Sequence, residues 1–248
     1  MSPALALVGL APGLAIGSFL NVVAARVPLR LSIVSPGSAC PQCETPIAWY
    51  DNVPLLSYAL LRGRCRSCRC GIPWKYPAVE AATAVLVSAS LARFGLTLHG
   101  LAAVILCATL VAITVTDLER RLIPNRIVVP AAGVVLVVQS LADRTPEYAL
   151  AGFGAALFLL VAALAYPGGM GMGDVKLALL LGAALGRYVS VGLMVGFVAA
   201  LVPAVVLLAR HGSAARKMAL PFGPFLALGG LVALFAGHPL LHAYLSLR

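Results

Sequence analysis

Two aspartates are the first candidates for catalysis in this sequence, because acidic side chains are scarce and these two border long apolar stretches. Only eight Asp and Glu residues occur among 248. Asp117 ends one apolar stretch, and Asp174 opens a later one directly after a glycine-rich turn. Ionisable groups at the edge of such stretches are costly to keep and are functional hypotheses by default.

The chemistry expected of two neighbouring carboxyl groups is hydrolysis of a peptide bond. Carboxyl groups a few ångströms apart share one proton, since both cannot ionise easily. The ionised member can then activate water while the protonated member donates to the substrate carbonyl. We therefore interpret Asp117 and Asp174 as the catalytic pair of an aspartyl peptidase. The structural alternatives are an Asp117 paired with Arg120 or Arg121, and an Asp174 that only caps a helix.

The turn around Asp174 supplies the expected supporting residues. Gly171 and Gly173 allow unusual backbone dihedrals and the close approach of an extended substrate. Lys176 follows two residues after Asp174 and can influence which carboxyl group holds the proton. The Gly-x-Gly-Asp pattern before a short span favours catalysis, whereas Glu119 faces elsewhere on its helix and is interpreted as a solvated interfacial acid.

Four cysteines form a second candidate site. Cys40 and Cys43 make one CxxC pair, and Cys65 and Cys68 make another, 21 residues further on. This spacing is typical of a four-thiolate zinc site. Zinc held by four thiolates has no open position, so the predicted zinc is structural and does not activate water.

The two remaining cysteines, Cys70 and Cys107, and an alternative to zinc binding also need to be considered. A redox pair or unligated surface thiols are the alternative to zinc. Cys70 is a spare thiol that can replace Cys68 as a ligand. Cys107 lies inside an apolar stretch, where a small buried hydrophobic side chain is the expected role.

The composition indicates that a bilayer surrounds the elements that position these residues. Hydrophobic residues make up 61% of the chain, charged residues only 10%, and the mean hydropathy is +1.00. A soluble domain carries about 25% charged residues. We expect an all-α polytopic membrane protein with about eight transmembrane helices, near 4–25, 77–94, 98–116, 126–142, 147–166, 174–187, 189–209 and 219–237.

The basic residues predict the orientation of these helices. Of the 18 Lys and Arg residues, 14 lie on the side that carries the first loop if eight spans cross the membrane. Basic loops stay cytoplasmic, so both termini are expected outside. The net charge of +10 therefore indicates topology and not nucleic-acid binding, since no continuous basic face is available.

Three parts follow from this topology. Residues 1–27 form the first transmembrane helix, which lacks the basic start of a signal peptide and is expected to be retained. Residues 28–76 form a cytoplasmic, zinc-ribbon-like loop domain between the first two helices. It is too small for a large apolar core, and domains of this size usually need a metal or a disulfide to fold. Residues 77–248 form the transmembrane aspartyl peptidase domain.

Several motifs of this chain resemble those of the bacterial type IV prepilin peptidases, members of the GxGD class of intramembrane aspartyl proteases. The similarity extends over nearly the whole chain and is most specific at residues 169–177. The other matching segments are 17–23 with Arg26 and Pro28, 46–57, 62–65, 76–80 and 221–225.

The resemblance implies a substrate, two cofactors and a location. Enzymes of this family cut the leader from prepilin-like precursors at the cytoplasmic boundary of the inner membrane, and many then methylate the new N-terminus with S-adenosylmethionine. It assigns catalysis to Asp117 and Asp174, and zinc to the four CxxC cysteines. No nucleotide fingerprint marks a cofactor site, although residues 49–52 can line one. Membrane lipids are expected partners of the basic loop.

Three other polar features have lesser roles. Asn21 is expected to hydrogen-bond between helices. Glu80 is expected to support the aspartates or to pair with an arginine, without direct catalysis. His238 and His242 share a helix face as a weak metal candidate.

Two functions from other classes compete with the peptidase. One is a transporter whose acids bind cations, and the other is a non-catalytic scaffold of a pilus or secretion machine. The acidic residues gather at one face and do not line a midplane path, which disfavours transport. Neither the particular precursor nor the oligomeric state follows from the sequence.

Overall fold

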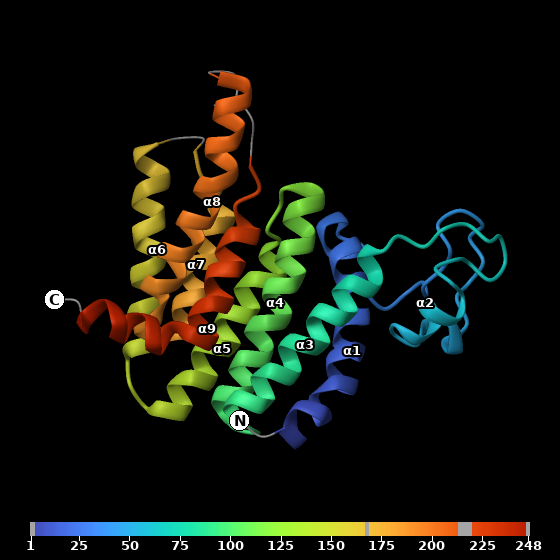
Figure 1. The fold of residues 1–248 in the computed structure, drawn as a ribbon, viewed down its shortest axis with the longest axis horizontal. Helices are drawn as coiled ribbons and strands as arrows, with labels where there is room; N and C mark the ends of the chain where they lie inside the picture. The colour runs from blue at the N-terminus through green and yellow to red at the C-terminus, as the bar shows by residue number, and fades with distance from the viewer. Residues whose placement is uncertain (1–2, 167–168, 213–219, 247–248) are drawn as a thin grey trace. The chain divides into compact units, whose positions relative to one another are not determined.

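The computed structural model describes residues 3–166, 169–212 and 220–246, and in these residues every regular element is a helix (Figure 1). The long helices are α1 (Pro3–Arg26), α3 (Lys75–Phe94), α4 (Leu98–Arg120), α5 (Asn125–Asp143), α6 (Glu147–Ala165), α7 (Met172–Leu185), α8 (Val189–His211) and α9 (Gly223–Ser246). The short ones are η1 (Val27–Leu29), η2 (Trp49–Asn52), α2 (Leu56–Leu60) and η3 (Gly186–Tyr188).

Eight long helices confirm the predicted all-α polytopic class. Seven segments are long and apolar enough to cross a membrane, and one of them, Met172–His211, is 40 residues long. A straight helix of that length would measure about 60 Å, twice the ~30 Å of a bilayer core. The segment is not one helix but contains both α7 and α8. Helix α7 ends before Gly186, whose φ of 56° lies outside the helical range.

The predicted boundaries differ most in the last helix. The sequence predicts a span over 219–237, whose first residue lies outside the described part of the chain. In the structure α9 continues through Pro239 to Ser246. Proline lacks an N–H and so removes one hydrogen bond from a helix, but α9 continues beyond Pro239.

The chain divides into two compact units, residues 1–96 and 97–248. The first contains α1, the loop and α3, and the second contains α4 to α9. The three-part division at 27 and 76 follows membrane topology and stays a prediction. Each unit is described separately below.

Within the first unit, α1 and α3 approach closely along a row of small residues. Gly9, Gly13 and Gly17 recur every four residues and face α3. A Cβ on Gly13 would lie 2.7 Å from Cα of Ala84, and one on Gly17 would lie 2.7 Å from Cα of Glu80. Small residues let helix backbones pack in a bilayer, where burial against lipid provides little driving force.

Within the second unit, α7 is the central helix. It packs against α4, α5, α6 and α9, and Leu177, Leu180 and Leu181 are fully buried. By contrast α6 exposes large apolar side chains such as Phe153, which is 61% exposed, and Leu164. Such a surface is unfavourable in water and suits lipid, in agreement with a multi-pass membrane protein.

Candidate active site and metal centre

Asp117 lies in the last turn of α4 and is held by the start of α9. Its side chain is buried, and its Oδ2 accepts a hydrogen bond of 2.9 Å from the backbone N–H of Gly223. A Cβ on Gly223 would lie 2.8 Å from the same oxygen, so a larger residue there would displace the Asp117 carboxyl group. Asp117 forms no ion pair with Arg120 or Arg121 among the described residues, but the Arg121 N–H donates to the Asp117 carbonyl at 2.8 Å, so the structural alternative stays open.

Asp174 is the third residue of α7 and is also buried. Its Oδ2 accepts a hydrogen bond of 3.2 Å from the backbone N–H of Gly171, and its own N–H donates to the Gly171 carbonyl at 3.0 Å. Asp174 therefore reaches back to the N-cap residue of its helix, as acidic residues at this position often do. The capping alternative is correct as geometry, but it uses only one of the two carboxyl oxygens.

The turn that follows Asp117 packs against the start of α7, which carries Asp174. A Cβ on Gly173 would lie 2.8 Å from Cβ of Ile123, and Lys176 Nζ donates to Asn125 Oδ1 at 2.8 Å. Two segments distant in sequence thus place both carboxyl groups in one region of the second unit.

The hydrogen bonding leaves one oxygen of each carboxyl group available. Among the described residues, the Oδ1 atoms of Asp117 and Asp174 accept no hydrogen bond. Each group is thus fixed through Oδ2 and can use Oδ1 toward water or a substrate. The Lys176 ammonium contacts Asn125 and forms no ion pair with either group, so its influence on the shared proton stays a prediction.

The four cysteines lie in the first unit, on two turns of the same construction. Cys40 accepts a backbone hydrogen bond from Glu44 and donates to Thr45, while Cys65 accepts from Arg69 and donates to Cys70. Both turns contain a left-handed residue, Glu44 with a φ of 56° and Arg69 with a φ of 61°. The two CxxC pairs are therefore structurally equivalent, as in a zinc ribbon.

The cysteine sulfurs have the spacing that a tetrahedral metal requires. The four Sγ atoms of Cys40, Cys43, Cys65 and Cys68 lie within 4.8 Å of one another, with Cys40–Cys68 at 3.8 Å and Cys43–Cys65 at 4.0 Å. Zinc–sulfur bonds of about 2.3 Å imply sulfur separations near 3.8 Å. Backbone N–H groups of Cys43 and Gln42 lower the pKa of the Cys40 thiol to about 6, which favours the thiolate that a metal binds.

Cys70 lies beside this cluster, where the first turn has Thr45. Its Sγ is 3.4 Å from that of Cys40, whereas the Thr45 hydroxyl accepts from Cys43 Sγ at 3.3 Å. Thr45 in the first turn and Cys70 in the second, each five residues after the first cysteine of its pair, therefore both contact a cysteine of the cluster. The described four-sulfur group includes Cys68 and not Cys70.

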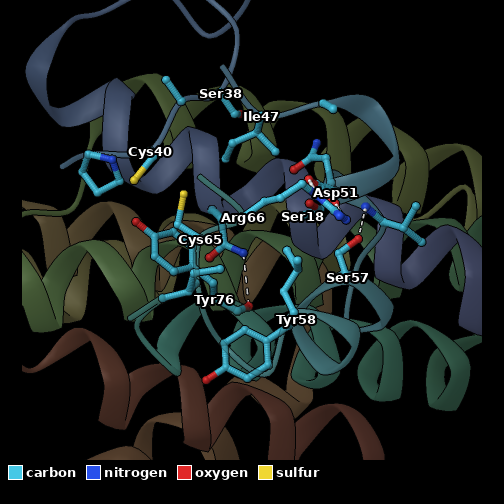
Figure 2. Close-up of a pocket in the computed structure, with 18 of the residues that line it drawn as sticks. Ser18, Ser38, Cys40, Ile47, Asp51, Ser57, Tyr58, Cys65, Arg66 and Tyr76 are labelled. Carbon is cyan, nitrogen blue, oxygen red and sulfur yellow. Dashed lines mark hydrogen bonds and ion pairs between the residues drawn. The ribbon is translucent and has the colours of Figure 1, made fainter. Parts of the chain in front are cut away.

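A cavity of about 520 Å³ lies in the first unit, between the loop and the ends of α1 and α3 (Figure 2). Its walls include Asn21, Tyr50, Glu80 and the sulfur-bearing Cys40 and Cys65. The predicted cofactor stretch 49–52 contributes to it through Tyr50, Asp51 and Asn52. The sequence contains no single motif that marks this cavity.

Two polar residues of this cavity have contacts that the sequence predicted only in part. Asn21 Nδ2 donates to the Tyr76 carbonyl at 3.2 Å, which joins α1 to α3 as expected. Among the described residues, no arginine forms an ion pair with Glu80. Its Oε2 accepts a hydrogen bond of 2.9 Å from the backbone N–H of Leu55.

Two functional contacts were missed by sequence reasoning. Gly223 was recognised only as part of a matching segment, and Glu80 only as a supporting acid. The two candidate metal histidines, His238 and His242, stack on each other with ring centroids 6.4 Å apart and join no metal-binding group in the described residues. Cys107 is fully buried in α4, as predicted.

Protein-family models match two parts of the chain. Residues 12–94 match the bacterial peptidase A24 N-terminal domain. Residues 104–209 match the type IV leader peptidase family. The two matches thus contain the cysteine cluster and both aspartates, respectively.

Curated proteins are similar over most of the chain. A prepilin leader peptidase/N-methyltransferase from Bacillus subtilis (strain 168) is 35% identical over 247 residues, which cover 95% of this chain and 96% of the relative. Its namesake from Burkholderia pseudomallei (strain 1026b) is also 35% identical, over 92% of this chain and 84% of the relative. That of Myxococcus xanthus (strain DK1622) is 43% identical, over 70% and 54%. No solved structure matches the chain significantly.

Proposed function

Because the chain belongs to the type IV leader peptidase family, we propose that it removes the leader of prepilin-like precursors and uses Asp117 and Asp174 as its catalytic pair. One observation carries this proposal. Two buried carboxyl groups from distant segments are each fixed by one glycine N–H, and the turn that follows one of them packs against the start of the helix that carries the other. This arrangement suits two groups that handle one proton.

The proposed reaction needs one carboxylate and one protonated carboxyl group. The carboxylate takes a proton from water as the water oxygen attacks the carbonyl carbon of the scissile bond, and the other carboxyl group donates its proton to the carbonyl oxygen. Collapse of the tetrahedral intermediate breaks the C–N bond, and a proton passes to the leaving nitrogen. Gly171 and Gly173 keep side chains away from the turn, so that an extended substrate can approach Asp174.

The proposal includes a second reaction and a structural metal. The curated relatives carry N-methyltransferase in their names, and we assign this chain N-methylation of the new N-terminus with S-adenosylmethionine. The four cysteines of the cluster would bind one zinc ion, whose donor set and sulfur spacing they match. With four thiolates the zinc keeps the loop folded and has no position for substrate.

The proposed location is the inner membrane, with the cysteine loop in the cytoplasm. Basic residues gather in the loops on that side, as cytoplasmic loops do. Prepilin leaders of this family are often basic, so simple attraction between substrate and loop is not expected. Anionic lipid headgroups are the better partners for the loop arginines.

The test replaces each aspartate with asparagine. We expect Asp117→Asn and Asp174→Asn each to abolish leader cleavage, because asparagine keeps the Oδ hydrogen-bond acceptor but cannot exchange a proton. The purified protein is incubated in detergent with a precursor pilin, and mass spectrometry identifies both product N-termini. Glu119→Gln is the matched control, since Glu119 is an exposed acid on the same helix and should leave cleavage unchanged.

The competing functions predict other outcomes in the same assay. A scaffold retains its cellular role after either aspartate is replaced, and a transporter shows ion flux that depends on these acids without a peptide product. Full cleavage by either asparagine variant would refute the catalytic assignment.

A further inference from the structure

Glu80 is a buried carboxylate that lines the cavity of the first unit. It is 9% exposed, and its Oε2 accepts the N–H of Leu55, a residue with a φ of 58°. A non-glycine residue in this region of backbone space is strained, so the hydrogen bond to Glu80 helps to hold the loop in its conformation. The remaining oxygen, Oε1, has no hydrogen-bond partner in the described residues.

No cation of the described residues neutralises Glu80. The two arginines of the cavity wall are engaged elsewhere: Arg26 donates to the Ser32 and Gly37 carbonyls, and Arg66 forms a two-point ion pair with Asp51. Arg66 lowers the pKa of the Asp51 carboxyl by hydrogen bonding to it. Of the two acids in the wall, Asp51 therefore has its counter-charge and Glu80 has none.

A buried carboxylate without a counter-charge is costly unless a ligand supplies one. The cavity is large enough for a small molecule, since ligand pockets usually enclose about 300–1,000 Å³. Tyr58 also lines it, and aromatic faces attract organic cations, whereas the rings of Tyr50 and Tyr76 already have Arg66 and Lys75 over them. Charge and shape thus favour one class of ligand, an organic cation.

We propose that this cavity is the site of methyl transfer and that Glu80 binds the cationic group there, an inference that rests on the proposed methyltransferase function. The positive group is either the sulfonium of the methyl donor or the ammonium of the newly exposed peptide N-terminus. Both present an organic cation to the same carboxylate.

The residues present fit both partners of such a transfer. S-adenosylmethionine supplies a methyl group on a positively charged sulfur. The ammonium of the acceptor first loses one proton, and the Glu80 carboxylate can take it. The amine nitrogen then bonds to the methyl carbon as the electron pair of the sulfur–carbon bond returns to sulfur. A second proton leaves the methylated nitrogen to give the neutral amine.

The decisive variant is Glu80→Gln, with Glu119→Gln as matched control. Glutamine keeps an oxygen that accepts the Leu55 N–H but removes the negative charge, so the loop is expected to fold. Glu119 is an exposed acid outside the cavity and the cysteine turns. Precursor pilin and S-adenosylmethionine are added to each protein, and mass spectrometry reads cleavage and methylation separately. We expect Glu80→Gln to cleave normally and to methylate about a hundredfold more slowly, and Glu119→Gln to match the wild type in both.

A binding measurement identifies the source of the cation. Calorimetry with S-adenosylmethionine, and separately with a synthetic peptide that has the mature N-terminus, compares wild type with Glu80→Gln. Weaker binding of the donor assigns the sulfonium, and weaker binding of the peptide assigns the ammonium.

Three results distinguish failure of the Glu80 inference, failure of the proposed methyltransferase function and a loss of stability. If Glu80→Gln methylates and binds both probes like the wild type, Glu80 is only a structural acceptor and the inference is wrong. If the wild type cleaves but never methylates, the methyltransferase part of the proposed function fails instead. Loss of the structural role is detected as lower thermal stability, which Glu80→Ala should show and Glu80→Gln should not.

Discussion

At the scale of single residues, the candidate active site is positioned by backbone N–H groups of glycine. Gly223 donates to Asp117 and Gly171 donates to Asp174, with no arginine paired to either carboxylate in the described residues. A backbone donor has no rotamer freedom, so it fixes a carboxyl group at a small entropic cost. Fixed geometry of this kind favours catalysis, because small displacements of reacting groups reduce rates strongly.

Gly223→Ala tests this positioning. The added Cβ would lie 2.8 Å from Asp117 Oδ2, so the carboxyl group or the start of α9 has to move. We expect leader cleavage to fall by about a hundredfold, the cost typical of a misplacement near 1 Å. Cleavage rates of the purified variant provide the measurement.

Gly133→Ala is the matched control for this substitution. Gly133 lies in α5, and a Cβ there meets nothing within 4 Å. The control should cleave like the wild type. Wild-type cleavage by Gly223→Ala as well would mean that Asp117 does not depend on this close contact.

The sequence indicated the candidate acids but not the groups that hydrogen-bond to them. Asp117 and Asp174 stand out because acids are rare at the ends of apolar stretches, and the structure places them in one unit. The donor to Asp117 comes from Gly223, far along the chain, and no local pattern reports a backbone N–H that becomes a donor only after folding. Glu80 was undervalued for the same reason, since its isolation from cations depends on where Arg26 and Arg66 point.

At the scale of elements, the loop of the first unit consists of two equivalent turns that converge on four sulfurs. Ala39 pairs with Pro46 and Arg64 with Gly71, so a short bridge closes each turn. Such small turns bury little apolar surface, so the proposed zinc would stabilise them. The same turns form part of the cavity wall through Cys40 and Cys65, so metal and cavity are linked.

Substitution of Cys43 tests the zinc assignment. Purified wild-type protein should contain about one zinc per chain, and Cys43→Ser should lose it, because three thiolates bind the ion much less tightly than four. Metal analysis and thermal stability of both proteins provide the readouts. We expect a lower melting temperature in the variant and in wild type treated with a chelator.

Cys70→Ser distinguishes the ligand cluster from its neighbour. Cys70 lies 3.4 Å from Cys40 but outside the four-sulfur group, so this variant should retain its zinc. A wild-type protein that folds, is reduced and contains no zinc would contradict the assignment. Loss of zinc from Cys70→Ser with retention by Cys68→Ser would instead transfer the fourth ligand to Cys70.

The helices themselves were predictable because a bilayer imposes their length. Stretches of about 20 apolar residues have few alternatives to a transmembrane helix, and all eight predicted spans correspond to long helices. The end of α9 was not predictable in this way, since the helix continues to Ser246, nine residues beyond the predicted span of 219–237. The pairing of α1 with α3 depends on glycines that match across two helices, a relation that neither helix shows alone.

At the scale of the whole molecule, the two proposed reactions belong to different compact units. Asp117 and Asp174 lie in residues 97–248, whereas Glu80, its cavity and the cysteine cluster lie in residues 1–96. The family matches divide at nearly the same place. This division suggests that either reaction can be removed without the other.

A doubly substituted protein, Asp117→Asn with Asp174→Asn, tests this independence. Supplied with S-adenosylmethionine and a synthetic peptide that already has the mature N-terminus, it should methylate at the wild-type rate while cleaving no precursor. Mass spectrometry of the peptide gives the rate. A large loss of methylation in a variant that retains its zinc would mean that the two aspartates serve both reactions.

The shortness of α7 limits how far its two ends can reach. With 14 residues the helix is about 21 Å long, against the ~30 Å of hydrocarbon that a straight crossing requires. Because α7 is buried among other helices, protein and not lipid covers it. In a straight crossing at least one of its ends would therefore lie at the depth of the hydrocarbon, where backbone outside a helix is tolerated only inside protein or beside a water-filled cavity.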